Sequence, residues 1–155
     1  MKNIYIYIDG KKIPTFEEKT VLEAARENGI YISSLCNHSD LKVRASCRVC
    51  VVKIEGQSGL STACSTKVFD GMRVSTNSAE VKRARKINLE LVFAQHNEEC
   101  FDCVWNSSCD LLKLAKENEV KINRFKDRKS NFPVYQFGNA IQFDSSKCID
   151  CRNCV

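Results

Sequence analysis

The sequence lacks the long apolar runs of a membrane protein. No stretch of its 155 residues approaches the ~18 consecutive apolar residues that a spanning helix needs. The first ten residues alternate apolar and polar side chains, and they contain neither the apolar core nor the small-residue cleavage site of a secretory signal. These absences predict a cytoplasmic location, with no membrane span and membrane association only through partners.

The common motifs of enzyme active sites are missing as well. The chain has no phosphate-binding glycine loop, no dinucleotide fingerprint and no recognisable arrangement of nucleophile and base. It also has no internal repeat and no low-complexity segment. The sequence therefore predicts no catalytic residue within these positions, and whether the chain belongs to an enzyme stays open at this point.

Cysteine, in contrast, is abundant: the chain has ten, in three groups. Their spacing is Cys36-x10-Cys47-x2-Cys50-x13-Cys64, then His96-x3-Cys100-x2-Cys103-x5-Cys109, then Cys148-x2-Cys151-x2-Cys154. Because the sequence shows no secretory signal, a reducing compartment is expected to keep these thiols free. Regularly spaced free thiols indicate metal sites rather than a disulfide framework.

Iron–sulfur ligation explains all three groups. Four thiolates suit a [2Fe–2S] centre, one imidazole with three thiolates supplies four ligands for a [4Fe–4S] cubane, and C-x2-C-x2-C begins a [4Fe–4S] motif. Zinc is the alternative for the first group, since four thiolates also make a tetrahedral zinc site, although such sites usually contain two C-x2-C pairs and this group has one. The sequence thus predicts electron transfer, with a zinc-binding interaction module as the alternative.

The expected secondary structure of the first half predicts an α+β fold. Residues 3–8 alternate with period two and end at the Asp9–Gly10 turn, after which residues 12–15 return as a strand that Pro14 restricts to an edge. A capping box of Thr20 and Glu23 begins a helix that stops at Gly29. Three further short strands are expected at residues 49–54, 60–63 and 69–74.

The second half is expected to be mainly helical. Ser78 can cap a helix from residue 79 to about residue 95, and His96 follows its end. Its apolar stripe is predicted to contain Ala84, Ile87, Leu91 and Ala94. A second, short helix is expected after Cys109. Residues 120–139 have no sustained period and are interpreted as a connector that leads to a strand at residues 140–143.

Residues 46–55, SCRVCVVKIE, resemble the cysteine loop and following strand in the N-terminal ferredoxin-like domain of [FeFe]-hydrogenases, of the complex I large iron–sulfur subunit and of NAD-dependent formate dehydrogenases. Residues 96–109 are similar to the histidine-ligated H-x3-C-x2-C-x5-C motif of the same families. Residues 143–154 resemble the first half of a bacterial two-cluster ferredoxin domain, whose motif continues to a fourth cysteine. The resemblance implies a β-grasp [2Fe–2S] ferredoxin-like domain (1–77), a small helical [4Fe–4S] domain with one histidine and three cysteine ligands (78–119), and a connector with an incomplete ferredoxin motif (120–155).

In that family the first group holds a [2Fe–2S] cluster and the second a [4Fe–4S] cluster. The third would hold a further [4Fe–4S] cluster if the chain continues, and otherwise its thiols bind nothing stable. The implied function is an electron-transfer module, the N-terminal part of a hydrogenase or NADH-linked oxidoreductase subunit. Implied partners are other redox subunits, a ferredoxin or an NAD(P)H-oxidising flavoprotein. The alternative is the N-terminal piece of a catalytic [FeFe]-hydrogenase or formate dehydrogenase subunit whose active site lies beyond residue 155.

The formal charge of +5 arises mainly at Lys82–Arg83, at Arg85–Lys86 and between Lys121 and Lys129. Such clusters usually form a solvated helix face rather than a nucleic-acid site, so no nucleic-acid partner is predicted. The same charges can steer acidic redox partners, and the sequence alone does not separate these roles.

Overall fold

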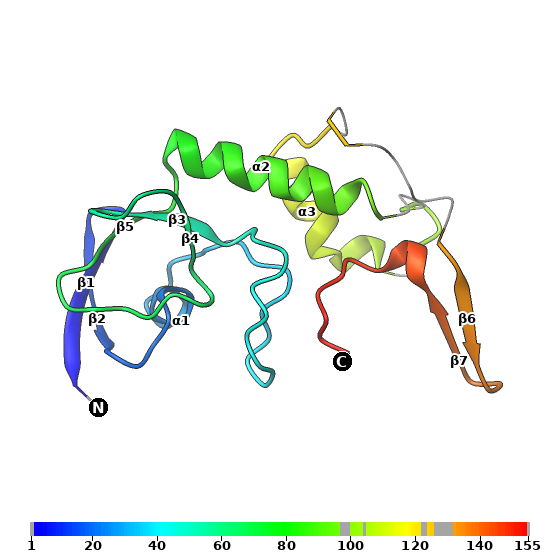
Figure 1. Ribbon diagram of the computed structural model, residues 1–155, viewed down its shortest axis with the longest axis horizontal. Helices are drawn as coiled ribbons and strands as arrows, with labels where there is room; N and C mark the ends of the chain where they lie inside the picture. The colour runs from blue at the N-terminus through cyan, green and yellow to red at the C-terminus, as the bar shows by residue number, and fades with distance from the viewer. Residues whose placement is uncertain (1, 97–99, 104, 122–123, 126–131, 155) are drawn as a thin grey trace.

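A computed structural model describes residues 2–96, 100–103, 105–121, 124–125 and 132–154 of the chain. A mixed sheet lies at one end and a two-stranded hairpin at the other, and the long helix α2 (Ala79–Phe93) runs between them (Figure 1). Most of the basic run between Lys121 and Lys129 lies outside the described residues. None of the helices in the described part of the chain is long and apolar enough to cross a membrane.

The sheet has five strands in the order β2-β1-β5-β3-β4. Strand β1 pairs antiparallel with β2 and parallel with β5, and β3 pairs antiparallel with both β5 and β4. The strand bounds are Asn3–Ile8 for β1, Lys11–Phe16 for β2, Val51–Ile54 for β3, Ser61–Thr62 for β4 and Arg73–Ser75 for β5. This arrangement with its packed helix is an α+β fold, as the sequence predicted, and is consistent with a [2Fe–2S] ferredoxin-like domain.

Local signals in the first half form the expected elements. Helix α1 (Val21–Glu27) begins at the predicted capping box, in which the Thr20 hydroxyl accepts a hydrogen bond from the Glu23 amide at 3.2 Å and the Glu23 carboxylate accepts one from the Thr20 amide at 2.7 Å. Gly29 follows with φ +69, the left-handed conformation that favours glycine after a helix. Strand β2, which contains Pro14, is at the sheet edge. The buried face of α1 packs on the isoleucines of β1 in one apolar core.

One predicted strand is displaced. The expected strand over residues 69–74 forms only as β5, because the chain turns before it. The Gly71 amide donates to the Tyr5 carbonyl at 2.8 Å, and the Asp70 carboxylate accepts from the Tyr5 amide at 3.0 Å. Asp70 and Gly71 therefore bind the backbone of β1 instead of extending a strand.

Helix α2 starts as predicted but buries a different face. The Ser78 hydroxyl accepts from the Val81 amide at 3.2 Å and caps the helix. The predicted stripe is correct only in part, because Ala94 is 1% exposed but Leu91 is 43% exposed. The buried side chains are Val81, Arg85, Leu89, Glu90 and Phe93. Two of them are charged, and each has a partner distant in the sequence, which hydropathy patterning does not detect.

The helical part has its own apolar core. Helix α3 (Asp110–Glu117) follows Cys109 as expected and packs on α2. The buried members of this second core come from α2, from α3 and from the loop between α1 and β3: Cys36, Cys47, Val49, Leu89, Phe93, Leu111, Leu114 and Ala115. Two cysteines of the first group, Cys36 and Cys47, thus belong to the core of the helices, whereas the other two, Cys50 and Cys64, belong to the core of the sheet.

The C-terminal part contains a strand that the sequence did not predict. Strand β6 (Val134–Phe137) pairs antiparallel with β7 (Ile141–Asp144), which agrees with the strand expected at residues 140–143. The interpretation of residues 120–139 as a connector is therefore wrong for β6. A 3₁₀ turn over Ser145–Lys147 leads from β7 to the last cysteine group.

Candidate iron–sulfur centres

The four cysteines of the first group are buried in one place. Cys36 lies in the loop after α1, Cys47 and Cys50 lie in the loop before β3, and Cys64 follows β4. Their exposed fractions are only 1–9%. The α1 helix and the sheet therefore bring together four thiols that are separated by up to 27 intervening residues in the sequence.

These thiols form two hydrogen-bonded pairs. The Cys47 thiol donates to Cys36 and lowers the pKa of Cys36 to about 5. The Cys64 thiol donates to Cys50 and lowers the pKa of Cys50 to about 7. The same hydrogen bonds raise the pKa of both donors, Cys47 and Cys64. Each pair therefore contains one cysteine whose thiolate form is favoured, and thiolate is the form that binds metal.

The two pairs lie close enough to interact. The charge of Cys36 raises the pKa of both Cys50 and Cys64 across the gap between the pairs. In the parts of the chain that the structure describes, no three or more His, Cys, Asp or Glu side chains converge on the position of one metal ion. The first group is thus an arrangement of two neighbouring thiol pairs.

Backbone groups surround the Cys36 sulfur. The backbone amides of Ser46 and Cys47 and the Ser46 hydroxyl donate hydrogen bonds that also lower the pKa of Cys36. Ala45 and Arg48, on either side, have φ of +51 and +50. These left-handed conformations, which are uncommon outside glycine, turn the chain tightly around the thiols. Hydrogen bonds to sulfur are a known control of cluster potential.

The second group lies around a single cavity between the end of α2 and the start of α3. Its lining contains all four predicted ligands, His96, Cys100, Cys103 and Cys109, and also Lys147. The Cys109 sulfur accepts a hydrogen bond from the Leu112 amide at 3.4 Å and so caps α3. Residues 97–99 and 104 of this motif lie outside the described residues. The chain thus gathers one imidazole and three thiols.

The third group is more open. Cys148 and Cys151 are half-buried, and Cys154 is exposed. Cys148 and Cys47 line the same cavity of about 150 Å³, so the third group lies next to the first. The Ser46 hydroxyl oxygen also lies 3.3 Å from the Asp150 carbonyl oxygen. The fold therefore places cysteine groups that are about a hundred residues apart in the sequence next to each other.

Two residues that hold the first cysteine loop were not predicted from the sequence. Arg85 Nε donates to the Val49 carbonyl at 3.3 Å, and Asn88 Nδ2 donates to the Arg48 carbonyl at 2.6 Å. Both are on α2, and Arg85 belongs to a basic cluster that was predicted to be a solvated helix face. A local signal for Arg85 was present in the sequence. Val81 and Leu89 lie four residues before and after Arg85, which places Arg85 on the same helix face as two apolar residues.

Comparisons with known proteins give two family matches. Residues 1–79 match the family described as 2Fe-2S iron-sulfur cluster binding domain. Residues 85–124 match the family described as NADH-ubiquinone oxidoreductase-G iron-sulfur binding region. The first match covers just over half of the 155 residues and contains the first cysteine group. The second contains His96 and its three cysteines.

Individual relatives cover nearly the whole chain. The gamma subunit of the NAD-reducing hydrogenase HoxS of Cupriavidus necator is 36% identical in an alignment of 156 positions that covers 99% of this chain and 64% of the relative. The HndD subunit of the NADP-reducing hydrogenase of Solidesulfovibrio fructosivorans is also 36% identical, over 99% of this chain and 27% of its own length. The NADH-ubiquinone oxidoreductase 75 kDa subunit of Reclinomonas americana is 29% identical, over 98% of this chain and 22% of the relative. The chain thus spans less than two thirds of these relatives.

The fold has a match among solved structures. The crystal structure of NAD+-reducing [NiFe]-hydrogenase in the H2-reduced state contains a chain that aligns with a TM-score of 0.89 at 30% identity, over 98% of this chain and 64% of that one. The relatives are subunits of redox complexes. Both predicted kinds of cofactor, [2Fe–2S] and [4Fe–4S], agree with the families matched. The chain belongs to the family of 2Fe-2S iron-sulfur cluster binding domains and, together with the iron–sulfur binding region that follows, is an iron–sulfur electron-transfer module.

Proposed function

We propose that Cys36, Cys47, Cys50 and Cys64 hold a [2Fe–2S] cluster, with one thiol pair on each iron. The observation that carries this assignment is the pairing itself. A single zinc ion needs four donors around one point, whereas two sulfide-bridged irons need two thiolates each. The pairs Cys36–Cys47 and Cys50–Cys64 fit the second arrangement. We assign residues 1–77 to this domain and its fold to the β-grasp class, supported by the parallel pairing of β1 with β5 and the packed helix α1.

His96, Cys100, Cys103 and Cys109 are proposed as the ligands of a [4Fe–4S] cluster in a small helical domain over residues 78–119. Their common cavity supports this set. Because a neutral imidazole replaces one thiolate, the site is one charge less negative than an all-cysteine cubane, and its potential is expected to be higher.

For the third group we propose a further [4Fe–4S] cluster at Cys148, Cys151 and Cys154, within a segment over residues 120–155, when a fourth donor is supplied from elsewhere. Cys148 and Cys151 are half-buried, and Cys151 packs against the second core. Three thiolates fill three of the four ligand positions of a cubane. The exposure of Cys154 leaves room for that fourth donor.

The role we propose is the relay of single electrons within the N-terminal part of a hydrogenase or NADH-linked oxidoreductase subunit in the cytoplasm. Cluster chemistry supplies the one-electron steps, and the chain supplies position and potential. The second core supports a relay, because it packs Cys36 and Cys47 with Cys109 and Cys151 from the other two groups. The partners proposed are other redox subunits, a ferredoxin or an NAD(P)H-oxidising flavoprotein. Two relatives are named as subunits of hydrogenases that reduce NAD or NADP, which supports a redox partner.

Metal analysis of the purified protein tests this proposal. After reconstitution without oxygen we expect about six irons, two from the first site and four from the second, with equivalent acid-labile sulfide. More iron is expected only if the third group is occupied. Visible absorption and EPR should show both cluster types. Stoichiometric zinc in a colourless protein, without iron or sulfide, would exclude the proposed function.

A further inference from the structure

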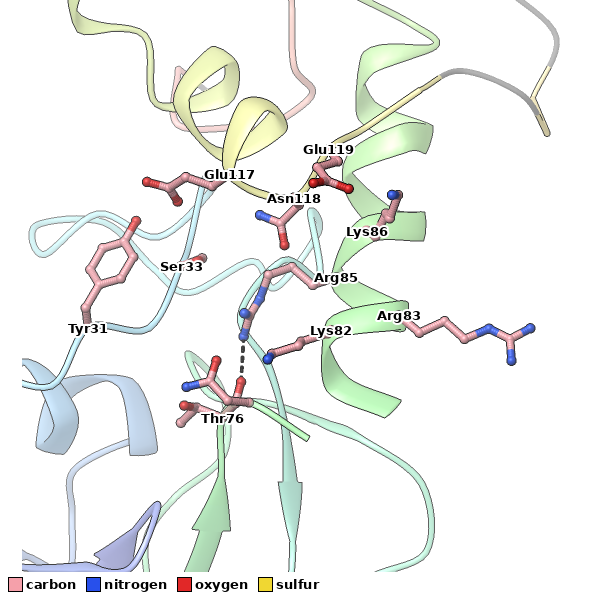
Figure 2. A pocket seen from close by; sticks show the side chains of 11 residues that line it. Tyr31, Ser33, Thr76, Lys82, Arg83, Arg85, Lys86, Glu117, Asn118 and Glu119 are labelled. Carbon is pink, nitrogen blue, oxygen red and sulfur yellow. Dashed lines mark hydrogen bonds between the residues drawn. The ribbon is translucent and has the colours of Figure 1, made fainter. Parts of the chain in front are cut away.

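Arg85 connects helix α2 to the loop that carries Cys47 and Cys50. It is only 8% exposed. Its Nε donates to the Val49 carbonyl at 3.3 Å and its Nη2 donates to the Thr76 carbonyl at 3.0 Å, the contact drawn in Figure 2. Val49 directly precedes Cys50. The guanidinium therefore holds the segment between two cysteines of the first group.

The charge of Arg85 is not cancelled by the groups to which it donates. Both of these hydrogen bonds end on neutral carbonyls. The Asp9 carboxylate accepts instead from the Thr76 amide at 2.8 Å and from the Thr76 hydroxyl. Burial lowers the pKa of Arg85, while the charges of Tyr31, Cys50 and Asp9 act in the opposite direction. An arginine stays protonated in such surroundings, so a positive charge lies near Cys50.

On its other side Arg85 lines an open cleft of about 650 Å³. Lys82 and Lys86 from the same helix line this cleft as well, and Glu117 and Glu119 come from the end of α3 and the turn after it (Figure 2). Arg85 thus borders the cleft and, through its hydrogen bond to the Val49 carbonyl, also holds the cysteine loop.

We propose that Arg85 is a positioning residue that raises the reduction potential of the cluster assigned to Cys36, Cys47, Cys50 and Cys64, and this inference rests on that assignment. Reduction adds one negative charge to the cluster. A positive charge close by, largely removed from water, stabilises the reduced form more than the oxidised form. The hydrogen bond to Val49 fixes the distance over which this attraction acts.

The neighbouring residue Asn88 provides a matched control. Its side-chain amide donates to the Arg48 carbonyl at 2.6 Å, one residue before Val49. Asn88 lies on the same helix and holds the same loop, but it carries no charge. A comparison of Arg85 and Asn88 therefore separates the effect of charge from the effect of loop attachment.

EPR-monitored redox titration of the full chain, reconstituted with iron and sulfide, tests the inference in wild type, Arg85→Gln, Arg85→Lys and Asn88→Ala. Arg85→Gln should lower the equilibrium constant for reduction of the [2Fe–2S] cluster about tenfold. For one electron this is a fall of about 59 mV in the midpoint potential. Arg85→Lys keeps the charge and should stay within about threefold of wild type, as should Asn88→Ala. The midpoint of the His96 cubane should not move in any variant.

Equal shifts in Arg85→Gln and Arg85→Lys, or in Arg85→Gln and Asn88→Ala, would overturn the inference in favour of a purely structural role. So would an unchanged midpoint in Arg85→Gln. If Arg85→Gln does not fold, Arg85→Lys decides, because a tenfold weakening with the charge retained contradicts the proposal and a midpoint near that of wild type supports it. Absence of a [2Fe–2S] signal in wild type is a different result, and it would reject the ligand assignment itself.

Discussion

The sheet region and the C-terminal hairpin both lead into cysteine groups, but they bury very different amounts of apolar surface. In β1 the isoleucines at positions 4, 6 and 8 are 0–2% exposed, and the cysteines of this region are 1–9% exposed. In β6 every residue is exposed, and Cys154 is exposed as well. The first region therefore has an apolar core in addition to its cysteines, whereas the last region has little apolar burial to offset the entropy of ordering its chain.

Aromatic contacts on one face of the hairpin partly make up for its small apolar burial. Tyr135 stacks on Phe137 and on Phe143 with ring centroids 6.5 and 6.2 Å apart. These side chains remain 39–58% exposed. A two-stranded hairpin alone is marginally stable in water. A small loss of contact should therefore lower the stability of the hairpin and hardly change the stability of the sheet region. This contrast leads to the following predictions.

Cys50→Ser should have the largest effect. A serine hydroxyl at this position would be a weaker iron ligand than the thiolate, and Cys64 would lose its thiol partner. The [2Fe–2S] EPR signal should therefore disappear, and the sheet region should lose several kcal/mol of its free energy of unfolding. Cys154→Ser is the control from the exposed group. It should leave both the signal and the denaturation midpoint of the sheet region unchanged. Loss of the cubane signal in Cys50→Ser would show that the two sites are not independent.

His96 variants should affect only the middle of the molecule. His96→Ala should leave the cubane labile, and iron analysis should show a loss of about four irons. His96→Cys retains a ligand and adds a negative charge, so the cubane should persist at a lower midpoint potential in an EPR-monitored titration. An unchanged midpoint in both variants would remove His96 from the proposed ligand set.

The two apolar regions should respond very differently to loss of a side chain. Ile6 is fully buried at 0% exposed, and Ile6→Ala should lower the free energy of unfolding by about 2–5 kcal/mol in a denaturant titration. Ile141 in the hairpin is 62% exposed, and Ile141→Ala should change it by no more than about 0.5 kcal/mol. Similar losses in both variants would mean that the hairpin is buried in the protein in solution.

The smallest effect on function is expected at the helix cap. Thr20→Ala removes the hydroxyl that accepts from the Glu23 amide, which should cost about 1 kcal/mol in the same denaturant titration. Both cluster signals should be retained. Thr20→Ser keeps the hydroxyl and should be close to wild type. If both variants lose the same stability, the methyl group of the threonine matters more than the cap.

Features that depend on neighbours in the sequence were predictable. The capping box at Thr20, the cap at Ser78 and the edge position of Pro14 all follow from a few adjacent residues, and all are present. The cysteine spacing likewise predicted both kinds of cofactor through its resemblance to known iron–sulfur motifs, although the ligand number of the first group alone also suits zinc. The gathering of His96 with its three cysteines around one cavity agrees with that count.

Features that depend on distant partners were not predictable. The buried face of α2 was misassigned because Arg85 and Glu90 look like surface residues. Their burial depends on carbonyls at positions 49 and 76 and, for Glu90, on Arg124, whose amide donates to the Glu90 carboxylate at 2.9 Å. Strand β6 was missed because its side chains are exposed and so give no alternation. Neither property is encoded within a short window of sequence.

The second core also constrains the order of events during biosynthesis. Cys36 and Cys47 are packed against Leu89, Phe93 and Leu111, which a ribosome adds after all four cysteines of the first site. Since N-terminal segments fold as they emerge, a nascent chain that ends near residue 77 has its sheet but lacks one wall of the site. Stable insertion of the proposed first cluster should therefore follow synthesis of α2 and α3. Until then, the side chains that cover Cys36 and Cys47 are absent, and the site stays open to iron delivery.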